Sequence, residues 1–80
     1  MIAVDPEHVA GTLHKVGLSG DVWLDFSAVE RIDTQAAEAI ADLADRADAA
    51  SVQVHVRGVN AGLHKVLKLM GVGRRFTFTS

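Results

Sequence analysis

The 80-residue chain contains no cysteine and few aromatic residues, with one tryptophan, three phenylalanines and no tyrosine. Without cysteine it can form neither disulfides nor thiolate metal sites, so a domain this short relies on packing or on a partner for its stability. No apolar run approaches the roughly 20 residues that a membrane span needs, and the N-terminus lacks the charged-then-apolar pattern of a signal peptide. The sequence therefore predicts one soluble domain over residues 1–80, with no segment inserted into a membrane.

Acidic and basic residues are unevenly distributed along the chain. All ten acidic residues lie in residues 1–48, where three basic residues leave a formal charge of −7, and the five basic residues of 49–80 give +5. A basic surface for nucleic acid or anionic lipid is one interpretation, and neutralisation between neighbouring acidic and basic elements is the other. We favour neutralisation and expect no nucleic-acid partner, because no aromatic side chains alternate with the basic ones as single-strand binders require.

Four segments have the residue pattern of strands: 1–4, 22–26, 52–57 and 76–79. The first is a short apolar run, and in the other three apolar side chains alternate with polar ones, which is the period of a half-buried strand. The polar positions share one face of the sheet, which would carry Trp23, Asp25, Gln53, His55, Arg57, Thr77 and Thr79. Parallel strands covered on both faces are continuously apolar, so we expect this face to be wet or covered by something outside this sequence.

Three helices are expected between the strands. Asp5-Pro6 supplies an N-cap followed by a proline, which predicts a first helix from there to Gly17. A second is expected over 34–48, and a third follows Asn60 and ends at Gly71. The inward residues of the second helix are expected to be Ala36, Ile40, Leu43, Ala44 and Ala47, opposite Glu38, Asp42 and Asp45. The third helix is expected to turn Leu63, Val66, Leu67 and Met70 inward and His64, Lys65 and Lys68 outward.

The order of these elements, β-α-β-α-β-α-β, predicts an α/β fold. We expect a four-stranded, mixed or mostly parallel sheet with three helices mainly on one face, because right-handed crossovers put successive helices on the same side.

Residues that could carry chemistry are few. Asp25, Asp33, His55 and His64 are the only polar groups that could form an acid–base set, and they show no motif spacing. The four histidines include no pair three or four apart on a helix. The segment 71–75, Gly-Val-Gly-Arg-Arg, follows a helix and precedes a strand, the reverse of a phosphate-binding loop, and is interpreted as a turn. We therefore predict no catalysis, no metal and no cofactor.

The most informative segment is 22–37, Val-Trp-Leu-Asp-Phe-Ser-Ala-Val-Glu-Arg-Ile-Asp-Thr-Gln-Ala-Ala. It resembles the signature of STAS domains, in which a strand ending in Asp-aliphatic-Ser leads to Asp-Ser/Thr-Ser/Thr-Gly at the start of the second helix. The resemblance continues through 52–60 and Leu63 to Phe76, whereas residues 1–21 match only in the order of elements. It implies a non-catalytic regulatory domain that works by binding a protein partner.

The switch residue of the family is replaced in this sequence. In phosphorylatable members, which resemble anti-sigma-factor antagonists, a kinase modifies the hydroxyl residue two places after the motif Asp; Gln35 stands there, and an amide cannot accept phosphate. Thr34 is the only hydroxyl left in the motif, with helix capping as its expected role and phosphorylation as the weaker alternative. We expect Asp33, Thr34, Gln35 and Glu38 to form the partner-facing edge with the connector 27–33. For Asp25 and Asp33, turn and capping roles are the alternative.

Ala36 stands in place of the motif glycine, and the Asp-x-x-Ala form is similar to the cytosolic C-terminal domains of sulfate permease (SulP) transporters. The turn Gly58-Val59-Asn60 resembles theirs as well. The small STAS subunit of phospholipid-trafficking ABC transporters has a similar Asp-Thr pair and a similar turn. The resemblance therefore implies a SulP-type domain first, with a stand-alone, phosphorylation-independent antagonist or the ABC-transporter subunit as alternatives.

The implied partner is a transporter membrane domain or an anti-sigma factor. The implied location is the cytoplasm, or the cytosolic face of a membrane within a longer chain. The family's N-terminal hairpin is reduced to residues 1–4 and its final helix is missing, so we expect either a minimal member or an excised piece. Homodimerisation through the strand edge at 1–4 or through the wet sheet face stays open.

Overall fold

The computed structural model describes residues 1–72 and 75–79. Over these residues the elements are β1 (Ile2–Ala3), α1 (Val9–His14), β2 (Val22–Asp25), α2 (Thr34–Ala50), β3 (Val54–Arg57), α3 (Ala61–Leu69) and β4 (Phe76–Thr79). The four strands form one sheet in the order β1-β2-β3-β4, and each neighbouring pair is parallel. The predicted α/β fold is therefore confirmed, with an entirely parallel sheet. Gly73 and Arg74 of the expected turn lie outside the described residues.

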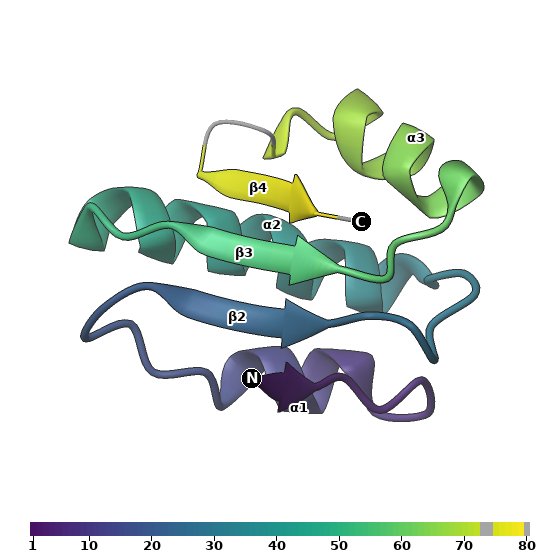
Figure 1. Cartoon of the computed structure of the whole chain (residues 1–80), viewed down its shortest axis with the longest axis horizontal. Coiled ribbons are helices and arrows are strands. Elements are labelled where there is room, and N and C mark those ends of the chain that lie inside the picture. Colours follow the sequence, from purple (N-terminus) through teal and green to yellow (C-terminus); the bar gives the residue numbers. More distant parts are fainter. Residues whose placement is uncertain (73–74, 80) are drawn as a thin grey trace.

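The sheet separates an apolar face from a polar one. Val22, Leu24 and Phe26 point toward the helices and are buried, as are Val54 and Val56 of the next strand. Figure 1 looks onto the opposite face, with α2 passing behind β3. This open face carries the polar positions expected from the sequence, because side chains alternate along each strand.

Helix α2 begins and ends with recognisable caps. The Asp33 carboxylate accepts a hydrogen bond from the Ala36 N–H at 2.8 Å, and Ser51 ends the helix in the left-handed conformation with φ 57°. Its buried face is mostly alanine and consists of Ala36, Ala39, Ile40, Leu43 and Ala47. The sequence predicts four of these five residues correctly, and Ala39 is buried in addition. Ala44, also expected inside, is half-buried.

The predicted bounds of the first helix are wrong at both ends. The Asp5 carboxylate accepts from the Glu7 N–H at 2.9 Å, and the His8 N–H donates to the Asp5 carbonyl at 3.0 Å, which forms a separate turn before α1 starts at Val9. Asp therefore closes a local turn here instead of capping the helix. At the other end, the Val16 N–H bonds the Leu13 carbonyl, a tight i to i+3 bond that ends the helix before Gly17.

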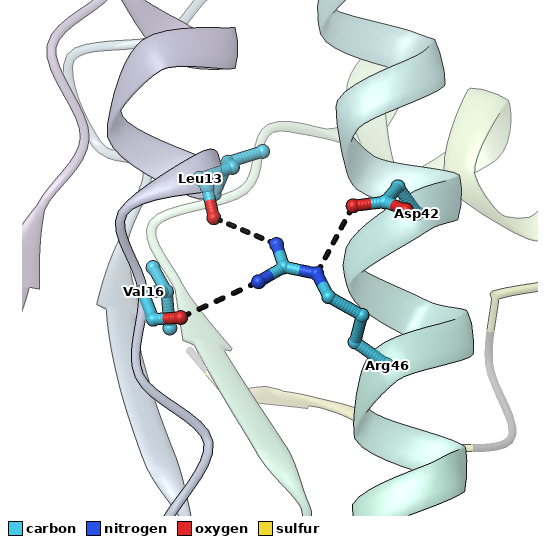
Figure 2. Close-up of polar contacts among 4 residues, drawn as sticks. All are labelled: Leu13, Val16, Asp42 and Arg46. Atoms are coloured by element: carbon cyan, nitrogen blue, oxygen red, sulfur yellow. Dashed lines mark hydrogen bonds and ion pairs between the residues drawn. The ribbon is translucent and has the colours of Figure 1, made fainter.

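Arg46 of α2 supports the end of α1. Its guanidinium Nη2 donates to the Leu13 carbonyl at 3.0 Å and Nη1 reaches the Val16 carbonyl at 3.5 Å, while Nε pairs with Asp42 at 3.0 Å (Figure 2). The carbonyls at a helix C-terminus lack intrahelical partners, and a cation satisfies them well. One side chain thus ties the shortest helix to the longest.

The predictions for α3 are correct for its core contacts and wrong for its flanks. Leu63 and Leu67 are buried as expected, but Val66 is 41% exposed. His64, expected to point outward, is half-buried, and its ring forms a T-shaped pair with that of Phe78, with the centroids 4.7 Å apart. The helix has nine residues and lies beside the edge strand β4 (Figure 1), and only Leu63 and Leu67 of its residues are buried.

The acidic and basic parts of the chain meet in the structure. Arg75 donates through Nε to Asp48 at the end of α2, at 3.0 Å. This ion pair joins residues on either side of the charge boundary and agrees with the neutralisation favoured from the sequence.

Candidate functional site

The helices run antiparallel to the strands, so all three begin at the carboxyl edge of the sheet (Figure 1). In open parallel sheets this edge is the usual place for binding sites. Asp33 lies there at the end of the connector 27–33, and Thr34 and Gln35 follow in the first turn of α2, next to the segment that leads into α1.

The beginning of the connector is held by a turn at Asp25. Its carboxylate accepts from the Ser27 N–H at 2.9 Å, and the Phe26 N–H donates to the Arg57 carbonyl at 2.8 Å. Hydrogen bonds from the Ser27 hydroxyl and N–H, with a smaller contribution from Arg57, hold the pKa of Asp25 below its usual value. Asp25 therefore has the structural turn role that was the alternative in the sequence interpretation.

The Gly58-Val59-Asn60 turn fixes the connector from the other side. Gly58 has φ +75°, and a Cβ there would lie 2.7 Å from the Ser27 backbone nitrogen. The Asn60 side chain accepts from the Leu63 N–H at 2.7 Å and donates to the Glu30 carbonyl at 2.9 Å. Only glycine allows this close approach at a positive φ, and asparagine caps α3 while it holds the connector.

The predicted capping role of Thr34 is wrong, because Asp33 is the N-cap. Asp33 has extended backbone angles and its carboxylate reaches the Ala36 N–H, whereas Thr34 is the first residue inside the helix. The two residues are adjacent and both residue types cap helices well, so the sequence pattern could not decide which of them is the N-cap. Thr34 is exposed.

A cleft of about 450 Å³ lies between the segment that begins α1 and the start of α2. We call it the docking cleft. Asp33 and Gln35 lie on its α2 side, and Thr34 is not among its lining residues. The complete lining is Pro6, Glu7, His8, Val9, Ala10, Gly11, Arg31, Ile32, Asp33, Gln35 and Ala36.

Glu38 lies one turn further along α2 and is not in this cleft. It lines a second groove, of about 460 Å³, between α1 and α2 together with Ala10, His14, Gln35, Ala39 and Asp42. Gln35 belongs to both hollows, so it connects them. Of the four predicted site residues the structure thus brings Asp33, Gln35 and Glu38 onto one continuous surface and leaves Thr34 beside it.

The α1 side of the cleft was missed by sequence reasoning. His8 is positioned there by Asp5, whose carboxylate lies 3.1 Å from the His8 Nδ1. The Glu7 N–H and His8 together lower the pKa of Asp5. Residues 6–11 carry no motif, but the parallel order of strands was a usable signal, because it places the beginnings of α1 and α2 at the same edge.

The charge around the two hollows is predominantly acidic. Glu7, Asp33 and Glu38 outnumber the cation Arg31, and Asp42 further along is paired with Arg46. None of the residues that line the docking cleft is Ser, Thr or Tyr. The residues lining the adjoining groove carry no hydroxyl either, and the exposed hydroxyl residue Thr34 lies beside the two hollows.

Among the described residues, no helix has both the length and the apolar character needed to cross a bilayer. The fold and the site define a small α/β domain with a parallel sheet, helices on one face and a cleft at the carboxyl edge of the sheet. A family model described as "Mlab, STAS domain" matches residues 6–78, so the chain belongs to the STAS domain family. The match confirms the resemblance found in 22–37 and includes most of the region that matched only in element order.

Comparison with curated proteins and with solved structures gave no significant match. STAS domains mediate protein interactions and are generally non-catalytic. Membership in the family therefore gives this chain a regulatory, interaction-based role in general terms.

Proposed function

We propose that this chain is a non-catalytic regulatory domain of a membrane transport system, most similar to the cytosolic domain of a SulP-type transporter. In this proposal its protein partner seats at the docking cleft and the adjoining groove, on Asp33, Gln35 and Glu38. The partner is the membrane part of the transporter, and the domain works in the cytoplasm or at the cytosolic face of the membrane.

The observation that carries the proposal is the position of Gln35. It lies at the junction of the two hollows, where phosphorylatable members of the family place a hydroxyl residue. A phosphate there would add about −1.5 to −2 charges and repel a partner. An amide cannot be phosphorylated, so the charge of this surface stays the same. A docking site without a phosphorylation switch suits a domain that stays attached to its partner better than a kinase-controlled antagonist.

A second observation favours the transporter-linked forms as a group. The Gly58-Val59-Asn60 turn, which resembles that of SulP domains and of the small ABC-transporter subunit, contacts the connector through Gly58 and Asn60. It therefore supports the segment that leads into the docking cleft. The ABC-transporter subunit is the second candidate function on this ground.

The charge of the site indicates the chemistry of the partner surface. Glu7 and Glu38 are exposed carboxylates, and the N–H that α2 presents at Ala36 is already bonded by Asp33. The Asp33 carboxylate also adds a negative charge at the start of α2, which disfavours an acidic or phosphate-bearing partner group there. We therefore expect basic side chains on the partner.

Fractionation of the source cells tests the transporter assignment. An antibody raised to this domain is used to read the size and compartment of the native polypeptide. A large polypeptide in the membrane fraction is expected for a SulP-type protein, and an 8.5 kDa chain that sediments with membranes is expected for the ABC-transporter subunit. A chain of that size found free in the soluble fraction would contradict both transporter forms.

Site-specific photo-crosslinking tests the docking cleft independently. A photoreactive residue is placed at position 35 and, as the control, at Gln53, the other glutamine of the chain, which precedes β3 at the far end of the sheet. We expect an adduct with the transport partner from position 35, and from position 53 no adduct except with a second copy of this chain. Equal labelling from both positions, or labelling only from position 53, would contradict the assignment.

A further inference from the structure

The open face of the sheet is the least explained surface of the molecule. Parallel sheets occur almost only with both faces covered, and this sheet is parallel throughout. Trp23, the sole tryptophan of the chain, stands on this face and is 50% exposed. A large aromatic side chain in the centre of an uncovered sheet indicates that another surface packs against it.

The strand register arranges the face in two rows. In the first, Trp23 is level with His55 and Thr77, and its ring stacks on the His55 ring with centroids 4.6 Å apart and planes within 11°. The two rings therefore stand face to face on the adjacent strands β2 and β3 and present their edges away from the sheet. Ring edges of this kind can pack against the rings of another surface.

The second row lies one pleat further along the strands and carries the charges. Ala3, Asp25, Arg57 and Thr79 are level with one another on successive strands. The acidic side chain is on β2 and the basic one on the adjacent β3, so the row is neutral but polarised. A surface of this kind is complementary to a copy of itself turned by half a revolution.

We propose that the open face is a homodimer interface, in which a second copy of this chain covers the sheet. The two-fold axis lies between the sheets, parallel to the strands and midway between β2 and β3. This operation places β2 of each copy over β3 of the other while it keeps the rows level. Asp25 then faces the second copy's Arg57, and Trp23 faces the second copy's His55, each pair occurring twice.

The same operation matches the outer strands. Ala3 at one end of the charged row faces the second copy's Thr79 at the other end, so small side chains meet at the rim. The footprint of four short strands is small, roughly 15 Å by 13 Å from strand spacing and rise. It is below the size of a standard interface, so we expect a weak, concentration-dependent dimer.

The dimer leaves the docking cleft accessible. The cleft lies on the helix side, between the beginnings of α1 and α2, whereas the interface is on the opposite face. The proposed dimer therefore goes beyond the proposed function, and a test of one does not decide the other.

Tryptophan fluorescence and sedimentation together test the interface, because the only fluorescent tryptophan lies at its centre. The full chain is measured from about 1 µM to about 1 mM, the range in which weak complexes dissociate. We expect the average mass to rise from 8.5 kDa toward twice that value. We expect the Trp23 emission to shift to shorter wavelength over the same concentrations, because dimerisation removes water from the ring.

Charge variants test the geometry. Arg57→Glu places a carboxylate over the second copy's Asp25 and is expected to weaken the dimer at least tenfold, and Asp25→Lys is expected to do the same. Mixing the two variants should restore association, because each copy then meets an opposite charge at both contacts. Leu69→Ser removes an 80% exposed side chain from α3 and serves as the control that leaves the dimer unchanged.

Circular dichroism establishes that each variant is folded, and if Asp25→Lys unfolds, the comparison of Arg57→Glu with Leu69→Ser carries the test. A chain that stays monomeric across the range would overturn the proposal. A dimer that forms without a Trp23 shift, or that Arg57→Glu leaves intact, would assign association to another surface such as the β1 edge. Protection of Trp23 only by a transport partner would assign the face to that partner instead.

Discussion

Replacement of Gly58 by alanine is expected to destabilise the domain severely, because two costs combine at this residue. Its φ of +75° is strained for a residue with a side chain, which costs about 1–2 kcal/mol. The new Cβ would also lie 2.7–2.8 Å from backbone and side-chain atoms of Ser27. Since the nearest of these atoms belong to the backbone, the connector itself must move.

The structure supplies a matched control in Gly71. It has φ +74°, and within residues 1–72 and 75–79 no atom beyond Gly71 and its chain neighbours lies within 4 Å of the position that a Cβ would take there. Gly71→Ala therefore incurs the backbone strain alone, offset by about 0.4–1 kcal/mol from the lower entropy of the unfolded chain. We expect a net loss of about 0.5–1 kcal/mol for this control.

Gly58→Ala incurs the same strain and also displaces the connector. Movement of Ser27 weakens the hydrogen bond from the Phe26 N–H to Arg57 and the one from Asn60 to Glu30, each contributing about 1 kcal/mol. With residual overpacking the total loss is about 3–4 kcal/mol. A domain of 80 residues has a free energy of unfolding of about 4–12 kcal/mol, so this variant should be only marginally folded.

Urea unfolding followed by circular dichroism and Trp23 fluorescence measures both variants. We expect Gly58→Ala to lose about 2–3 kcal/mol more than Gly71→Ala, which is the contribution of the close approach to Ser27. Equal losses in the two variants would refute the reasoning, because they would mean that the connector does not press against Gly58.

Three further predictions concern stability. Arg46→Met should lower the free energy of unfolding in urea by about 1–2 kcal/mol, because it removes charge-assisted hydrogen bonds to α1 from a side chain that is 34% exposed. An unchanged free energy of unfolding would show that these bonds do not stabilise the fold. Asp33→Ala should cost about 1 kcal/mol as a lost N-cap, whereas Thr34→Ala should change the free energy of unfolding by less than about 0.5 kcal/mol; the reverse order would make Thr34 the cap. Hydrogen bonds lower the folded-state pKa of three carboxyl groups, those of Asp5, Asp21 and Asp25. The stabilisation from these groups is complete above the ordinary pKa of 3.8 and is lost as the pH falls through the lowered folded-state values. The urea concentration at the unfolding midpoint should therefore decrease below about pH 4, and should decrease less when these residues are replaced by Asn.

Sequence periodicity was sufficient for the sheet and for α2. Alternation along 22–26 and 54–57 predicts which side chains are buried, because a strand with one covered face has no other arrangement for its apolar residues. The helical period predicted the buried stripe of α2 correctly except that Ala39 is buried where Ala44 was expected. Periodicity was insufficient for Val66, since a short helix at the sheet edge buries a narrower stripe than its apolar pattern suggests.

The candidate site was predictable only on its α2 side. The residues Asp33, Gln35 and Glu38 belong to a motif, whereas the opposite wall at Pro6–Gly11 is defined by topology and by a turn that competes with the helix at Asp5. Local propensity could not decide between a turn and a cap there, because the same carboxylate forms either. The separation of Thr34 from the cleft likewise depends on which of two adjacent residues caps α2.

The measurement that tests the central claim most directly is the affinity of the purified chain for the partner recovered by crosslinking at position 35. Gln35→Lys is compared with Gln53→Lys, which makes the identical chemical change at the other end of the sheet. We predict that Gln35→Lys weakens binding at least tenfold, because it adds a cation and bulk where a basic partner surface docks, while Gln53→Lys leaves the affinity unchanged. Unchanged affinity for a folded Gln35→Lys variant would contradict the assignment of the docking cleft.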